Sequence, residues 1–174
     1  MVLGKVGDKN MEPVKEFAGL ASDSREVKPG YLFAALAGSH ADGAAFISDA
    51  VRRGAVAILA RPEARATAEA LGVRFIADEN PRLRLAHFAA AFFGAQPSVV
   101  AAVTGTNGKT SVASFVRQLW EAGGLAAASL GTLGVETAAG VKPGSLTTPD
   151  SLTLHRDLSS EERRVGKECR SRWS

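Results

Sequence analysis

The sequence predicts an α/β protein, and three observations lead to this prediction. Short apolar runs without strict alternation follow one another from about residue 30 onward. Segments whose apolar residues recur at helical spacing separate these runs. A glycine-rich turn, TGTNGKT, joins a further apolar run to an amphipathic segment. Since buried strands that alternate with helices form parallel sheets covered on both faces, we expect a small N-terminal α/β domain and the truncated start of a second, parallel-sheet domain.

The first predicted domain spans residues 1–97, and several residues within it mark where helices begin and end. Pro62 opens a helix that stops at Gly72, and Gly54 ends the helix before it. Asn80 is suited to cap a helix that has Pro81 at its first position. The predicted strands are residues 31–36, 56–60 and 73–76, and the predicted helices are residues 46–53, 62–71 and 81–93.

The second predicted domain spans residues 98–158 and follows the linker-like sequence GAQPS. We expect, in order, a strand over 99–103, the glycine turn, a helix over 109–121, a strand over 125–130 and a loop over 131–150. One strand–helix–strand unit cannot close a core, because sheets of this kind need more strands. The sequence therefore predicts that this domain is incomplete.

The last residues, 159–174, differ in composition and are interpreted as a non-native tail of the kind that a sequencing adapter produces. Residues 160–174 carry five Lys/Arg and three Glu, whereas the rest of the chain carries 16 basic and 15 acidic residues. The net charge of +3 therefore gives no support to nucleic-acid binding. No apolar run is long enough for a membrane span, and the N-terminus lacks a signal-peptide core. We expect a cytoplasmic monomer without nucleic-acid or membrane partners.

The turn GTNGKT has the chemistry of a phosphate-binding loop. It departs from the strict pattern GxxxxGK[ST], because Val103 stands where that pattern has its first glycine. Gly105 and Gly108 allow close backbone approach, and the helix that follows offers free N–H groups to an anion. Lys109 can reach the β- and γ-phosphates of a nucleotide, and the Thr110 hydroxyl can ligate the Mg²⁺ that bridges them. The structural alternative is a plain strand-to-helix turn with a solvated Lys109.

Several stretches resemble one family. VTGTNGKT, residues 103–110, resembles the ATP-binding signature of the Mur ligases and the folylpolyglutamate synthases, which use ATP to make an amide bond to a carboxylate. SDSR and KPGYLFAALAGSHADG resemble the uridine-nucleotide domain of the Mur ligases that add the third residue or the terminal dipeptide. LGTLG and LTTPDSLTLH resemble the third-residue branch, which adds a diamino acid to UDP-MurNAc-L-Ala-D-Glu. The resemblance covers residues 21–158.

The resemblance implies a mechanism and a set of site residues. ATP would phosphorylate the free D-glutamyl carboxylate, and an amine of meso-diaminopimelate or lysine would attack the acyl phosphate. Lys109 and Thr110 are implied as catalytic, with Mg²⁺ at Thr110 through the nucleotide. The residues implied to bind the ATP phosphates are Gly105, Thr106, Asn107, Gly108, Lys109, Thr110 and Ser111. Those implied to bind substrate are Ser22, Ser24, Ser39, His40 and Ala41 at the UDP end, and Thr147 and Thr148 at the muramoyl-peptide portion.

Some of these residues also fit a purely structural role. Ser24 could lie in a turn without touching a ligand. Residues 147–150 could form a polar loop that ends in a helix N-cap at Asp150 or Ser151. His87 stands between apolar helix positions and is expected to be a partly exposed helix residue.

Alternatives also remain for the whole protein. A terminal-dipeptide ligase shares the N-terminal features but is not expected to carry TTPD, and a folylpolyglutamate synthase lacks the uridine-nucleotide domain. A P-loop switch or kinase would have the strict glycine at position 103, and a non-catalytic binding module would keep UDP-substrate affinity alone. Family members carry a carbamylated lysine, acidic Mg²⁺ ligands and a C-terminal domain later in the chain. We therefore expect the 174 residues by themselves to be inactive, which ATP-dependent amide formation by them would refute.

Overall fold

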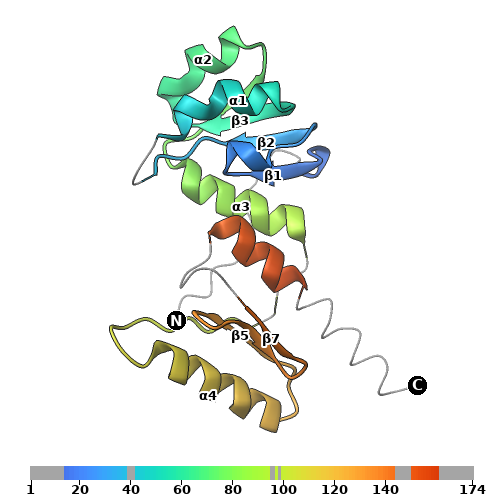
Figure 1. The fold of residues 1–174 in the computed structure, drawn as a ribbon, viewed down its shortest axis with the longest axis vertical. Coiled ribbons are helices and arrows are strands. Elements are labelled where there is room, and N and C mark those ends of the chain that lie inside the picture. The colour runs from blue at the N-terminus through green and yellow to red at the C-terminus, as the bar shows by residue number, and fades with distance from the viewer. Residues whose placement is uncertain (1–13, 39–41, 95–96, 98, 144–149, 161–174) are drawn as a thin grey trace, which may run out of the picture. The chain divides into compact units, whose positions relative to one another are not determined.

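The structure is a computed structural model that describes residues 14–38, 42–94, 97, 99–143 and 150–160 (Figure 1). It divides the chain into two compact units, Met1–Phe92 (unit 1) and Phe93–Ser174 (unit 2). Both units combine helices with a sheet, so the α/β class predicted from the sequence is confirmed. The boundary expected between residues 97 and 98 stays a prediction.

Unit 1 contains a four-stranded parallel sheet with the strand order β1-β2-β3-β4. The strands are β1 (Gly19–Ala21), β2 (Tyr31–Ala34), β3 (Ala55–Ala60) and β4 (Arg74–Ala77). The last three confirm the predicted strands to within two residues at each end. The first was not predicted, because three residues are too few for a hydrophobic pattern to stand out.

The described part of unit 1 has three α-helices, of which the first two lie between strands and the third follows β4. They are α1 (Ile47–Arg52), α2 (Arg65–Ala70) and α3 (Pro81–Phe93), and the 3-10 turns η3 (Gly43–Phe46) and η4 (Pro62–Ala64) lead into the first two. The Asn80 side-chain oxygen accepts a hydrogen bond from the Leu83 N–H at 3.1 Å, which confirms the predicted N-cap of α3. All three predicted helices form.

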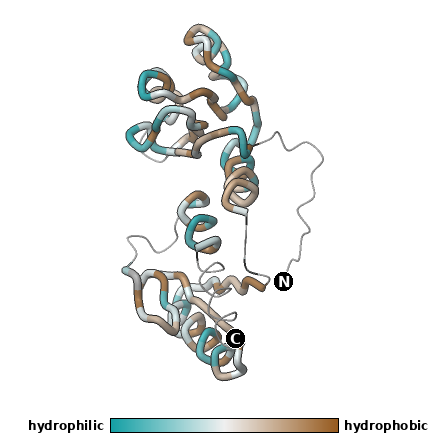
Figure 2. Tube along the Cα trace, turned by 90° about the vertical axis from the view of Figure 1, so that its right-hand side faces the viewer, coloured by the Kyte–Doolittle hydropathy of each residue, from teal (hydrophilic) through white to brown (hydrophobic). Residues whose placement is uncertain are grey.

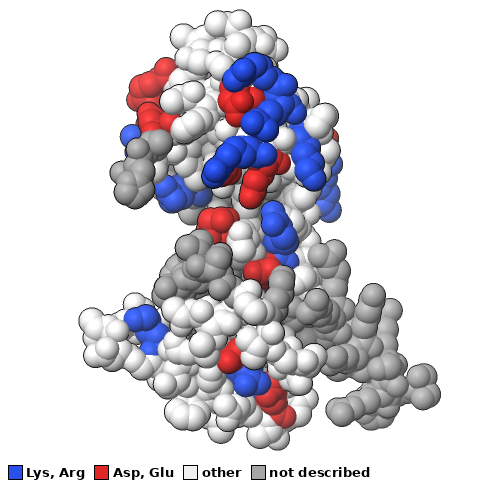
Figure 3. All heavy atoms as spheres, in the orientation of Figure 1, with Lys and Arg blue, Asp and Glu red and all other residues white. Residues whose placement is uncertain are grey.

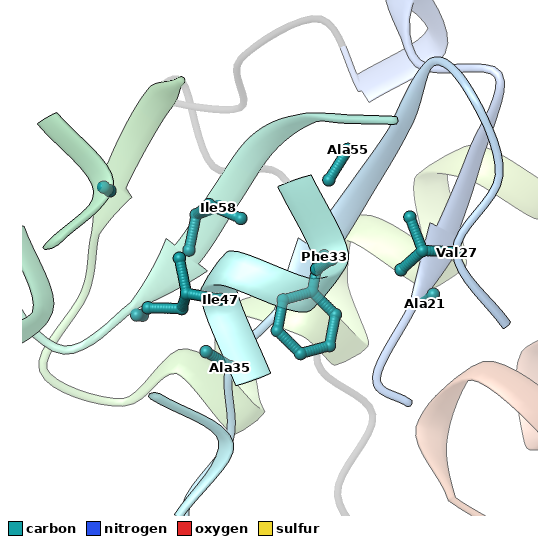
Figure 4. Close-up of a cluster of buried hydrophobic side chains, with 10 residues drawn as sticks. Ala21, Val27, Phe33, Ala35, Ile47, Ala55 and Ile58 are labelled. Carbon is teal, nitrogen blue, oxygen red and sulfur yellow. The ribbon is translucent and has the colours of Figure 1, made fainter. Parts of the chain in front are cut away.

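The core of unit 1 lies on both faces of its sheet. On one face, Phe33 and Ile58 pack with Ile47 of α1, and all three are at most 1% exposed (Figure 4). Leu32 and Leu59 are equally buried and point to the opposite face, since side chains alternate along a strand. Figure 1 shows α3 on that opposite side of the sheet. The sheet is therefore covered on both faces, as the continuous apolar strands predicted.

A close backbone approach joins the α1–β3 turn to the turn before β2. Gly54 has φ = 102°, and a Cβ atom at this position would lie 2.8 Å from the Pro29 Cα. The Gly30 N–H donates to the Gly54 carbonyl at 3.0 Å. Only glycine combines this conformation with this approach.

Unit 2 contains a helix, an antiparallel sheet and a second helix over 151–160. The first helix is α4 (Lys109–Ala122), and the strands are β5 (Ala128–Gly131), β6 (Gly134–Thr137) and β7 (Gly140–Lys142). The three strands pair in sequence order as two antiparallel hairpins. The predicted helix over 109–121 is confirmed, and the strand predicted over 125–130 forms three residues later than expected.

Two predictions for unit 2 are wrong. Residues 99–103 are not a strand, and Val99 and Val100 are each 64% exposed. A strand exists only beside a partner, and no described strand pairs with this segment. Residues 131–143 are not a loop but hold β6 and β7, because glycines with positive φ, Gly134 and Gly140, close two tight hairpin turns.

The helix over 151–160 begins at a well-formed cap. The Asp150 carboxylate accepts the Leu152 and Thr153 N–H groups at 2.8 and 2.9 Å, so the cap predicted at Asp150 or Ser151 is at Asp150. Ser159, which the sequence analysis placed in the tail, belongs to this helix. Its side chain is fully buried and donates to the Phe93 carbonyl at 3.0 Å. Residues 161–174 lie outside the described residues.

Candidate functional site

The glycine turn leads directly into α4. Gly105 has φ = 148° and Gly108, the residue before the helix, has φ = 74°, a left-handed conformation that favours glycine. The first helical hydrogen bond runs from the Val112 N–H to the Gly108 carbonyl at 2.9 Å. The N–H groups of residues 109–111 precede it and have no partner inside the helix. Together with the helix dipole, these donors make the start of α4 suitable for an anion.

The Lys109 side chain folds back over this turn. Its ammonium nitrogen donates to the Gly105 carbonyl at 2.6 Å and to the Thr106 carbonyl at 3.2 Å. These contacts hold the positive charge at the mouth of the turn, beside the N–H groups of the helix start. The structure thus brings Lys109 and the turn residues together as the sequence predicted, and their contact with phosphate stays a prediction.

The Thr110 hydroxyl also points to a specific neighbour. Its oxygen lies 3.2 Å from the Thr132 hydroxyl oxygen, in the turn between β5 and β6. The residue types fit a nucleotide-borne Mg²⁺, because such an ion keeps several waters and takes only one or two protein oxygens beside the phosphates. Within the described ranges, no three His, Cys, Asp or Glu side chains cluster as they would in a metal site made of protein alone. Thr110 is the described residue suited to such an ion.

A polar cluster fastens the β5–β6 hairpin to α4. One carboxylate oxygen of Glu136 accepts from Ser114 of α4 and from Ser129 of β5, each at 3.0 Å. The Arg117 Nε lies 3.9 Å from the same oxygen, and the Arg117 guanidinium donates to both oxygens of Glu121 at 2.7 and 2.8 Å. The Arg117 and Glu136 side chains are 16% and 17% exposed, so these charges are largely shielded from water.

The substrate residues predicted in unit 1 are only partly described. Ser24 is 6% exposed and begins the turn Ser24–Glu26, while Ser22 is half-buried next to it. Ser39, His40 and Ala41 lie outside the described residues, and so do Thr147 and Thr148 in unit 2. Among the predicted substrate residues the structure therefore describes Ser22 and Ser24, and the grouping of the whole set stays a prediction.

An ion-pair cluster surrounds Ser24. Asp49 of α1 pairs with Arg53 at 2.9 Å and with Arg52 at 3.2 Å. The hydrogen bond from Arg53, and after it one from the Ser24 hydroxyl, lowers the pKa of the Asp49 carboxyl below its ordinary value. Figure 3 shows Lys and Arg side chains beside Asp and Glu on the face of unit 1 that it presents. In this structure the Ser24 hydroxyl is engaged inside the protein, which is the structural alternative weighed above.

The segment that carries Ser39, His40 and Ala41 is held at both ends. Ala37 and Asp42 form an antiparallel bridge, and Asp42 caps η3 by accepting the Ala44 N–H at 3.0 Å. Arg82 of α3 donates to the Ala37 carbonyl at 2.8 Å across 45 residues of sequence. The sequence analysis did not single out Arg82, because nothing local to it signals this long-range contact.

The remaining candidates occupy ordinary positions. His87 lies on α3 and is half-buried, as expected for a helix residue between apolar neighbours. Thr132 and Glu136 were missed, although LGTLG was noted as a motif, because the region was interpreted as a loop. In the part of the chain that the structure describes, no helix is long and apolar enough to span a bilayer.

The structure defines an α/β protein in which a glycine-rich turn with a folded-back lysine leads into a helix. Comparison with known families is specific. The family model described as "Mur ligase family, catalytic domain" matches residues 16–93, and the "Mur ligase middle domain" matches residues 103–167. The chain belongs to the Mur ligase family.

Individual relatives point to one branch of this family. The chain is 56% identical over 141 residues to a UDP-N-acetylmuramoyl-L-alanyl-D-glutamate–2,6-diaminopimelate ligase of Chelativorans sp. (strain BNC1), covering 81% of the chain and 29% of the relative. It is 53% identical over 143 residues to the ligase of the same name from Mesorhizobium japonicum, covering 82% of the chain and 29% of the relative. The chain thus spans less than a third of the length of these relatives.

A solved structure of a ligase with this name is also similar to the chain. The TM-score is 0.71 and the sequence identity 26%, and the match covers 92% of this chain and 32% of the solved one. The likeness extends through both units, since little of the chain lies outside it.

Proposed function

We propose that this chain is the substrate-anchoring and phosphate-binding part of an ATP-dependent ligase that adds 2,6-diaminopimelate to UDP-MurNAc-L-Ala-D-Glu in the cytoplasm. One observation carries the proposal: the chain is 56% identical to a ligase of that name, in an alignment that covers 81% of the chain. The turn around Lys109 supports it, because it gathers a cation and free N–H groups at one helix start.

In the proposed reaction, the chain's own residues position and neutralise charge. An oxygen of the D-glutamyl side-chain carboxylate attacks the γ-phosphorus of ATP, and ADP leaves. The amine of the diamino acid then attacks the carbonyl carbon of the acyl phosphate, inorganic phosphate leaves, and the amine proton passes to solvent or a base. Lys109 would exchange its carbonyl partners for phosphate oxygens and offset the charge that moves onto the leaving ADP.

The metal that accompanies the nucleotide has a defined place in this proposal. Thr110 would hold it through the hydroxyl oxygen, and the turn residues from Gly105 to Ser111 would hold the phosphates through their N–H groups. When bound, the metal would supply positive charge that offsets the charge of the phosphates.

The substrate end of the site is proposed from the family resemblance alone. Ser22, Ser24, Ser39, His40 and Ala41 would contact the UDP portion. Thr147 and Thr148 would contact the muramoyl-peptide portion, close in sequence to the Asp150 cap. Ser24 would have to release or share its hydrogen bond with Asp49 to do so.

The test uses the protein expressed from its natural gene, with ATP, UDP-MurNAc-L-Ala-D-Glu and labelled meso-diaminopimelate. We expect ATP-dependent label transfer into the UDP-linked product and release of one phosphate for each amide. Lys109→Ala should lower kcat/KM by about 10²-fold or more. Lys15→Ala is the matched control, because Lys15 is an exposed lysine of unit 1 away from the turn.

Different outcomes separate the alternatives. In a parallel assay with ATP, labelled D-Ala-D-Ala and a UDP-MurNAc-tripeptide that already carries the third residue, incorporation of D-Ala-D-Ala would identify a terminal-dipeptide ligase. Binding of the UDP-linked substrate without ATP turnover would identify a non-catalytic binding module. Unchanged activity of Lys109→Ala would contradict the role proposed for the turn.

A further inference from the structure

Two threonine hydroxyls meet beside the glycine turn although they are 22 residues apart in sequence. Thr110 lies in the first turn of α4, and Thr132 lies at the tip of the β5–β6 hairpin. Their oxygens are 3.2 Å apart, and both residues are exposed. The contact is therefore not a by-product of core packing, and it places a second hydroxyl next to the proposed metal ligand.

The hairpin geometry explains why Thr132 stands at the tip. Gly131 pairs with Gly134, which leaves Thr132 and Leu133 as the two turn residues. Gly134 has φ = 101° and allows the chain to reverse at once. Leu133 is 55% exposed, so the tip is not held by burial of its apolar neighbour.

A second set of contacts fixes this hairpin on α4. Glu136, three residues after Leu133, accepts hydrogen bonds from Ser114 of α4 and Ser129 of β5. Ser114 is one helical turn beyond Thr110, so the hairpin is fastened at two successive turns of the same helix. Because Glu136 is largely shielded, the position of the hairpin tip is set by a network that does not include Thr132 itself.

We propose that Thr132 is a positioning residue for the Mg²⁺-nucleotide site, acting through Thr110. A hydroxyl has one hydrogen and two lone pairs, so an oxygen that ligates a cation must send its hydrogen elsewhere. Under this proposal the Thr132 Oγ1, 3.2 Å away, would accept the Thr110 hydrogen and leave a Thr110 lone pair for the metal. This inference rests on the proposed function, since it requires a nucleotide-borne metal at Thr110.

The arrangement matches how metal ligands are commonly held. Outer partners orient the direct ligand, and their loss typically lowers metal affinity 10–100-fold. Thr132 would therefore influence nucleotide binding only when the metal is present. A residue that merely stabilised the hairpin would influence binding with and without metal alike, and this difference makes the inference testable.

The experiment measures the affinity of the protein expressed from its natural gene for a non-hydrolysable ATP analogue, once with Mg²⁺ and once with EDTA. Thr132→Val should weaken binding about 10-fold in Mg²⁺ and leave binding in EDTA unchanged. Thr132→Ser, which keeps the hydroxyl, should bind like the wild type in both conditions.

Thr137→Val is the matched control in the neighbouring turn. Thr137 accepts the Ala139 N–H at 3.2 Å and donates to the Gly140 carbonyl at 3.3 Å, so its loss loosens the β6–β7 turn without touching Thr110. We expect wild-type affinity from this variant in both conditions.

The possible results separate the two proposals. A wild type that binds no analogue in either condition would overturn the proposed function and this inference with it. A wild type that binds, with Thr132→Val equal to it in Mg²⁺, would overturn the inference alone. Equal weakening of Thr132→Val in Mg²⁺ and in EDTA would also overturn it, because the role of Thr132 would then be structural.

Discussion

Units 1 and 2 both combine helices with a sheet, but different interactions stabilise the interior of each unit. In unit 1, Phe33, Ile58 and Leu59 are at most 1% exposed, and the sheet is covered on both faces. In unit 2, the buried hydrophobic residues of the described part are Val135 and Leu152, which are 8% and 3% exposed, and α4 buries none of its residues. Unit 1 therefore depends on packing, whereas unit 2 depends more on polar contacts.

The helix α4 makes the contrast concrete. Val112, Phe115 and Leu119 recur at helical spacing and are 46%, 62% and 70% exposed. Hydrophobic and hydrophilic residues both occur along this helix, which lies at the bottom of Figure 2. Its hairpin is fastened by Glu136, Ser114 and Ser129 rather than by an apolar seam. The comparison shows that the well-packed core belongs to unit 1, whereas the turn proposed to bind phosphate belongs to unit 2.

The largest expected effect tests the core of unit 1. Phe33→Ala removes a fully buried ring and should lower the free energy of unfolding of unit 1 by about 3–5 kcal/mol. Phe115→Ala, the same change on the exposed face of α4, should change the free energy of unfolding of unit 2 by less than about 0.5 kcal/mol. Denaturant unfolding followed by circular dichroism measures both, and amide hydrogen exchange assigns the loss to a unit. If the two variants cost the same, the α4 face is packed in solution and the comparison fails.

An intermediate effect concerns glycines with positive φ. Gly54→Ala should destabilise unit 1 by about 2 kcal/mol or more, because the new Cβ meets the Pro29 backbone in addition to the conformational cost. Gly108→Ala should cost about 1 kcal/mol, because no atom lies within 4 Å of the new Cβ. The same denaturant measurement applies, with Trp120 fluorescence in a Trp173→Phe background as the probe of unit 2. A larger loss for Gly108→Ala would show that the turn is crowded.

The smallest expected effect is the pH dependence of unit 1. The pKa of Asp49 is lowered from 3.8 in the folded protein, chiefly by Arg53. A carboxyl with a depressed folded pKa stabilises the protein above its unfolded pKa, and this contribution disappears as the pH falls through the folded value. Asp49→Asn should therefore be slightly less stable than the wild type at neutral pH and approach it below about pH 4. Acid titration of the unfolding midpoint measures this, and a constant gap down to pH 2 would contradict it.

The sequence predicted the parts of the fold that local chemistry determines. The Asn80 cap and the apolar strands β2, β3 and β4 follow from signals within a few residues. The strand expected over 99–103 did not form, because pairing depends on a neighbour that the local pattern cannot supply. The hairpins were missed because glycine and threonine suggested a loop, although a glycine beside a two-residue turn is also a hairpin signal.

The candidate site also combines features that local sequence determines with features that depend on distant residues. Lys109 and Thr110 could be selected as candidates from the sequence because the turn, the lysine and the helix start are contiguous, and their roles stay predictions. Thr132 and Arg82 act across 22 and 45 residues, so their roles are visible only once the chain is folded. Ser24 was recognised as a candidate by resemblance, but its near-complete burial beside Asp49 could not be predicted from SDSR alone.

The two carbonyl contacts of Lys109 have a consequence for ligand selectivity. Its ammonium group is already solvated by the protein backbone, through the Gly105 and Thr106 oxygens. An incoming anion therefore competes with two neutral dipoles, and a weakly charged anion such as chloride or acetate gains little by displacing them. A triphosphate concentrates several negative charges in one place and replaces both dipoles at once. In the proposed site, the folded-back lysine would therefore favour ligands of high charge density over singly charged anions.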